Sequence, residues 1–81
     1  MNTGRIVKSC AGRDKGKLLA VVGECDGFLL VADGKERPIQ KPKRKNLKHI
    51  SFIGQCLDEK MFISNKSLRR ALRQCEIKED F

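Results

Sequence analysis

The sequence predicts a mostly β chain of 81 residues, folded as a small barrel or two packed sheets and followed by one short helix. Short apolar runs separated by glycine-containing turns recur over residues 5–53. Two Asp-Gly pairs, Asp26-Gly27 and Asp33-Gly34, follow apolar runs and are strong hairpin signals. After residue 64 the apolar spacing changes to that of a helix.

The first two predicted strands enclose a charged loop. Residues 5–10 and 17–25 form these strands, and the second has Leu18–Val22 as its apolar middle. Between them, Ala11–Gly16 places charged residues between two glycines, which permit the positive φ angles that a tight turn needs. We therefore expect an exposed loop there.

Three further strands follow. Phe28–Ala32 is the third strand, and a polar fourth strand is expected at residues 35–40, after the second Asp-Gly turn. Residues 41–46 are expected to be an exposed loop, because prolines bracket its start and proline cannot donate to a ladder. Residues 47–53 at first alternate between apolar and polar side chains and then become apolar. This pattern predicts a fifth strand that closes the sheet.

The C-terminal segment is predicted to be helical over about residues 65–75, with Ser64 or Asn65 as its cap. A helix of ~16 Å is too short to be stable alone, so its apolar side must dock on the barrel. We assign residues 1–55 to the barrel and residues 56–81 to a C-terminal extension of the same domain. The apolar side consists of Leu68, Ala71, Leu72 and Cys75.

Positive charge is concentrated in one segment. The formal charge is +8, and residues 35–49 carry seven Lys/Arg against Glu36 alone, which gives +6. No acid interrupts the run from Arg37 to Lys48. Mixed signs are usual on a solvated surface, so this run favours a polyanionic partner.

Several other classes are disfavoured. The longest apolar run has five residues against the ~20 needed to span a bilayer, and no apolar segment follows a basic start. We therefore expect a cytoplasmic protein without a membrane partner. Gly12–Gly16 is too short for a phosphate-binding P-loop, and no Ser-His-Asp set is evident. No enzymatic activity and no cofactor are expected.

The four cysteines give no metal-binding spacing, and His49 is the single histidine. Each cysteine lies in or beside an apolar segment, so buried, reduced thiols are expected. The cysteines are Cys10, Cys25, Cys56 and Cys75.

The segments Gly4–Val7, Ala11–Lys17 and Ala20–Val22 together resemble the KOW motif of ribosomal large-subunit proteins and of NusG-like transcription elongation factors. The longer pattern, which adds Leu30–Gly34 and Asn46–Ile50, is similar to the archaeal and eukaryotic ribosomal "fourteen-e" family. This resemblance covers about residues 4–50. It implies an SH3-like five-stranded barrel, a KOW domain, that binds ribosomal RNA on or near the large subunit.

Cations in the two loops are the candidate RNA contacts, because Arg grips phosphate bidentately and Lys acts as a point charge. Scarce aromatic residues favour recognition of phosphate, sugar and shape over base stacking. Asn46 either reads a base edge or closes a turn. The predicted RNA-binding residues are Arg13, Lys15, Lys17, Lys35, Arg37, Lys41, Lys43, Arg44, Lys45, Asn46 and Lys48.

Gly12, Asp14 and Gly16 are expected to shape the first loop. Asp14 is expected to form an Asx-type turn or to hold Arg13 or Lys15 by a hydrogen bond. The predicted helix carries Arg69, Arg70 and Arg73, which either add a third RNA contact or form a solvated surface.

A protein-interaction module of the transcription or translation machinery, NusG-like, is the alternative function, because such barrels present edges and loops to other proteins. RNA, above all ribosomal RNA, is the expected partner, with ribosomal or transcription proteins as further candidates. The chain is expected to be a monomer.

Overall fold

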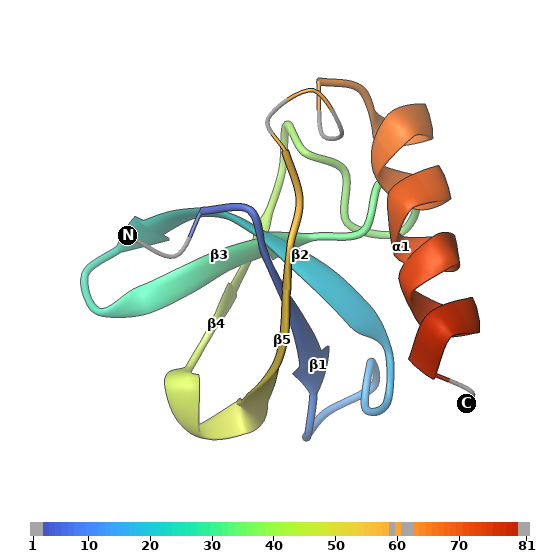
Figure 1. Cartoon of the computed structure of the whole chain (residues 1–81). Helices are drawn as coiled ribbons and strands as arrows, with labels where there is room; N and C mark the ends of the chain where they lie inside the picture. The colour runs from blue at the N-terminus through green and yellow to red at the C-terminus, as the bar shows by residue number, and fades with distance from the viewer. Residues whose placement is uncertain (1–2, 59, 61–62, 80–81) are drawn as a thin grey trace.

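The computed structural model describes residues 3–58, 60 and 63–79. Five strands form one antiparallel sheet in the order β4-β3-β2-β1-β5, and a C-terminal helix lies beside it (Figure 1). The prediction of a mostly β chain with a C-terminal helix is confirmed. The elements are β1 (Arg5–Ser9), β2 (Leu18–Cys25), β3 (Phe28–Ala32), β4 (Lys43–Lys45), the 3₁₀ helix η1 (Leu47–His49), β5 (Ile50–Cys56) and α1 (Asn65–Glu79).

The first three strands and the hairpin between β2 and β3 lie where the sequence predicts them. Asp26 and Gly27 form the two-residue connection, with φ angles of 50° and 82°. Two positive φ angles are the signature of a type I′ turn, whose twist matches that of the flanking strands. Cys25 and Phe28 pair directly across it.

The fourth strand was predicted in the wrong place. β4 lies inside the segment expected to be a loop, and residues 35–40 form no strand. The cause is Asp33, whose Oδ1 accepts hydrogen bonds from the backbone N–H groups of Lys35 at 2.8 Å and Arg37 at 2.9 Å. This local bonding bends the chain into a wide loop, so the Asp33-Gly34 pair makes no hairpin.

The sheet is not closed into a barrel, which corrects the expected closure. β4 and β5 are its two edges, and no ladder joins them in the part of the chain that the structure describes. The predicted fifth strand begins three residues late because residues 47–49 turn into η1, where Asn46 Oδ1 accepts the Lys48 N–H at 3.0 Å. η1 carries the chain from one edge to the other.

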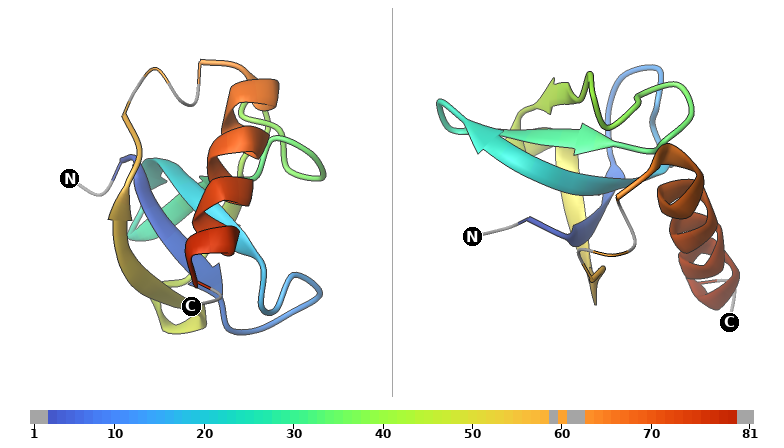
Figure 2. Two further views of the ribbon diagram at one scale, coloured as in Figure 1. Left: turned by 45° about the vertical axis from the view of Figure 1, so that its right-hand side comes forward. Right: turned by 90° about the horizontal axis from the view of Figure 1, so that it is seen from above.

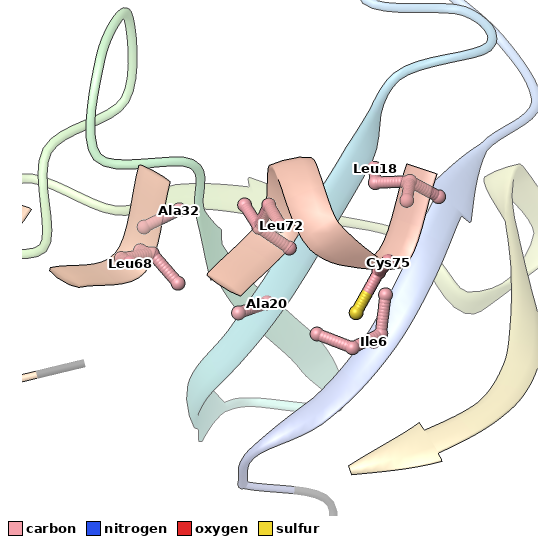
Figure 3. Close-up of a cluster of buried hydrophobic side chains, with 7 residues drawn as sticks. All are labelled: Ile6, Leu18, Ala20, Ala32, Leu68, Leu72 and Cys75. Carbon is pink, nitrogen blue, oxygen red and sulfur yellow. The ribbon is translucent and has the colours of Figure 1, made fainter. Parts of the chain in front are cut away.

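One apolar cluster lies between α1 and the sheet (Figure 3). Leu68 and Leu72 of α1 are buried, and Leu68 is fully inaccessible. Burial of a leucine side chain contributes roughly 1.5–3 kcal/mol, which compensates for the low intrinsic stability of an isolated helix. The sheet residues beneath the helix are Ile6, Leu18, Ala20 and Ala32.

A second cluster lies on the opposite face of the sheet. Alternation along β2 sends Leu18 and Ala20 toward α1 and Leu19 and Val21 away from it. The sheet is strongly twisted and curled, as the two further views show (Figure 2). Because α1 covers the other face, this curl encloses the second cluster. Its buried members are Val7, Leu19, Val21, Leu29 and Val31.

The expectation of buried cysteines is confirmed for Cys75 alone. Cys10, Cys25 and Cys56 are exposed, and no disulfide joins any of the four described cysteines. Cys10 follows the end of β1, and the other two exposed cysteines are the last residues of β2 and β5, where the sheet no longer covers a side chain. None of the described helices is long and apolar enough to cross a membrane.

Candidate nucleic-acid interface

The loop between β1 and β2 is tightly closed by its backbone. Gly12 and Gly16 have φ angles of 84° and 88°, which agree with the predicted need for glycine. The Gly16 N–H donates to Ser9 O at 2.8 Å, and the Lys17 N–H donates to Asp14 O at 2.9 Å. The loop therefore presents its side chains from a fixed frame.

Asp14 holds this loop against β4. Its Oδ1 accepts a hydrogen bond from Lys45 Nζ at 2.9 Å, and Ser9 Oγ lies at the same distance from it. Lys45 Nζ also donates to Ala11 O at 2.9 Å. The Lys45 and Asp14 side chains are only 6% and 13% exposed. Lys45 thus sits in the interior, and the partners of Asp14 are Lys45 and Ser9 in place of the predicted Arg13 or Lys15.

The environment of Asp14 favours the ionised form of its carboxylate. Partial burial acts to raise its pKa, but hydrogen bonds from Lys45 and Ser9 and the nearby charges of Lys45 and Lys43 act against it. The net result is a pKa below the ordinary value. Lys43 Nζ lies 3.9 Å from Oδ2, an ion pair without a hydrogen bond.

Ion pairs bring three charged segments together. The Asp14–Lys45 pair joins the 11–17 loop to β4, and Lys17 Nζ lies 3.1 Å from Glu36 Oε2, which joins the same loop to the 33–37 loop. Residues that are distant in sequence thereby form neighbouring parts of one surface. We call the 11–17 loop, the 33–37 loop and β4 together the loop surface.

Most of the predicted contact residues are exposed. Lys43 is 31% exposed beside Asp14, and the exposed Arg44 lies over the Phe28 ring at 5.8 Å from its centroid. Asn46 caps η1 with its side-chain oxygen. The predicted cations that are exposed and have no ion pair among the described residues are Arg13, Lys15, Lys35, Arg37, Lys41 and Lys48.

An arginine–aromatic pair was missed at the sequence level. Arg5 lies over the Phe52 ring, 4.2 Å from its centroid, and Phe52 is 36% exposed although its strand looks core-like. Only the register of β1 against β5, where Arg5 pairs with Cys56 and Val7 with Phe52, could have indicated this contact. Such stacking is worth about 0.5–1 kcal/mol at an exposed site.

No protein-family model matches this chain, and no curated protein matches it. Within the described residues, no three His, Cys, Asp or Glu side chains gather into a group that could hold a metal ion. The class of the protein is thus described by its fold and its charged surface. It is a small antiparallel sheet with a C-terminal helix, and it presents exposed cations from loops that ion pairs join.

Proposed function

We propose that this protein is a KOW-type RNA-binding protein with an SH3-like domain, and that it holds structured RNA on or near the large ribosomal subunit in the cytoplasm. One observation carries the proposal. Asp14 pairs with the buried Lys45 and with Lys43 of β4, so the acid within the first loop does not pair with the exposed Arg13 and Lys15 of its own loop. The loop surface is left with a net positive charge and a rigid frame.

The position of the glycine-containing loop supports the KOW resemblance. Gly12–Lys17 lies between β1 and β2, in the strand–loop–strand setting in which this motif is specific. A curled, five-stranded antiparallel sheet also agrees with an SH3-like architecture. The proposal for the fold family rests on these two features together.

The chemistry of the surface fits a folded RNA. Exposed Lys and Arg side chains recognise phosphates, and a rigid arrangement of them matches a fixed spacing of phosphates better than it matches a flexible strand. Phe28 and Phe52 each already face an arginine, so a platform for successive bases is not evident among the described residues.

Salt-dependent binding to a large-subunit ribosomal RNA fragment tests this function. The Arg13→Ala/Lys15→Ala variant should weaken binding and lower the slope of log K against log salt by about 0.7–0.9 for each phosphate that the variant no longer neutralises. The matched control is Lys60→Ala/Lys66→Ala, which removes the same charge from exposed positions elsewhere. Wild-type protein that shows no salt-dependent RNA binding, or two variants with equally weakened binding, would contradict the proposal.

A protein-interaction role has one observation in its favour. Leu47 is 51% exposed and borders a cavity of about 270 Å³ together with Phe28 and Leu29 at the β2–β3 hairpin. An exposed apolar side chain beside a hollow is a common feature of protein contacts. Nuclease-treated pull-downs that retain an acidic protein, and no longer retain it with Leu47→Asp, would favour this role.

A further inference from the structure

A positively charged groove of about 310 Å³ lies between the 33–37 loop and α1. Two leucines contribute its apolar part, and cations come from both the loop and the helix. The residues that line it are Leu18, Asp33, Lys35, Arg69, Leu72 and Arg73.

The cations in this groove are not compensated. Its one acid, Asp33, already accepts two backbone hydrogen bonds through Oδ1. Lys35, Arg69 and Arg73 form no ion pair among the described residues. The groove thus carries three positive charges against one engaged carboxylate, which favours an anionic ligand.

The two walls of the groove are fixed to each other by close contacts. A Cβ at Gly34, which has φ 78°, would overlap Asn65 O and lie 3.2 Å from Arg69 Cγ, so only glycine permits this approach. Asn65 Oδ1 accepts the Ile39 N–H at 2.8 Å, and its Nδ2 donates to Gln40 Oε1 at 2.9 Å. The groove is therefore preorganised, which lowers the entropic cost of binding.

The groove also continues the loop surface. The Lys17–Glu36 pair joins the 11–17 loop to the 33–37 loop, which forms one wall of the groove. Leu18, the residue after Lys17, lines the groove. The 11–17 loop and the 33–37 loop project to the same side of the molecule, beside α1 (Figure 2). A ligand that follows the loop surface would therefore meet α1 next.

We propose that this groove binds a backbone phosphate of the same RNA, an inference that rests on the function proposed above. Arg69 and Arg73 clamp the phosphate oxygens, since guanidinium groups match phosphate geometry bidentately. Lys35 supplies a point charge from the loop.

The test compares two double variants of α1 with the wild-type protein in the salt titration with large-subunit RNA. The Arg69→Ala/Arg73→Ala variant removes the two cations that α1 contributes to the groove. Lys66→Ala/Arg70→Ala removes the same charge from exposed positions of the same helix that do not line the groove. A slope lower by about 0.7–0.9 for the bound phosphate is expected only for the groove variant.

Folding is checked by thermal unfolding, and Lys35→Ala provides a second variant that leaves α1 unchanged. It should lower RNA affinity in the same direction as the groove variant. Wild-type binding with identical slopes for the groove and control variants would overturn the phosphate site and leave the proposed function standing. An absence of RNA binding by the wild-type protein would overturn both.

Discussion

Lys45 Nζ donates to Asp14 Oδ1 at 2.9 Å across a separation of 31 positions in the chain. Ser9 of β1 reaches the same oxygen, although two strands lie between β1 and β4 in the sheet. One carboxylate therefore contacts both β1 and the edge strand β4, which are not joined to each other by a backbone ladder. This contact fixes the shape of the loop surface.

Removal of Asp14 should be costly. Asp14→Ala leaves the ammonium of Lys45 buried and uncompensated, and we expect the free energy of unfolding to fall by about 3 kcal/mol, measured by urea denaturation. Glu36→Ala, which breaks the exposed Lys17–Glu36 pair, should cost less than about 1 kcal/mol. Similar costs for the two variants would show that the interior pair does not stabilise the fold.

The stability contributed by Asp14 should depend on pH. Because its folded pKa lies below the unfolded value of about 3.9, its contribution is complete above that pH and is lost as the pH falls through the folded pKa. The difference in unfolding free energy between wild type and Asp14→Asn should stay constant above about pH 5 and narrow below about pH 4. Urea titrations at several pH values measure this difference. If the difference in unfolding free energy between the two proteins were unchanged at acid pH, the lowered pKa of Asp14 would be contradicted.

The thiols should divide into two classes of reactivity. Cys10, Cys25 and Cys56 are exposed, whereas Cys75 is 5% exposed on the side of α1 that packs against the sheet. With a thiol reagent in excess, three groups should react rapidly and the fourth at the rate at which α1 opens. Cys75→Ala should remove the slow phase alone. Four rapid groups would mean that α1 does not remain docked.

Asn46 should act through the backbone of η1. Asn46→Ala removes the acceptor for the Lys48 N–H and should cost about 1 kcal/mol by analogy with other helix caps, as measured by urea denaturation. Asn46→Ser retains an acceptor oxygen, so both stability and RNA affinity should be preserved. Full stability with reduced RNA affinity in the serine variant would instead indicate that the amide reads a base edge.

Local signals in the sequence were sufficient for several elements. Asp26-Gly27 produced the predicted hairpin because adjacent residues alone determine a two-residue turn with positive φ angles. The apolar spacing of Leu68, Leu72 and Cys75 placed α1, since a helix that docks must present one continuous apolar side. In both cases the sequence signal lies within a few residues.

The same reasoning failed where a side chain competes with the backbone or pairs over a long distance. Asp33 precedes a glycine, as in many hairpin turns. Its carboxylate, however, accepts hydrogen bonds from two nearby N–H groups and widens the turn. β4 consists of three basic residues, which strand propensity does not favour. Its pairing with β3 and the contact of Lys45 with Asp14 both join residues that are distant in the sequence.

The β-rich class, the first three strands, the C-terminal helix and the excess of positive charge could all be predicted from the sequence, because periodicity, turn chemistry and composition are local properties. Only the folded chain shows which cations are exposed and which are buried. Folding turned Lys45 inward, joined the loops through the Asp14–Lys45 and Lys17–Glu36 pairs, and set Lys35 opposite Arg69 and Arg73. Burial and long-range pairing exist only once the chain has folded. The sequence of a basic run therefore does not distinguish a buried lysine from its exposed neighbours.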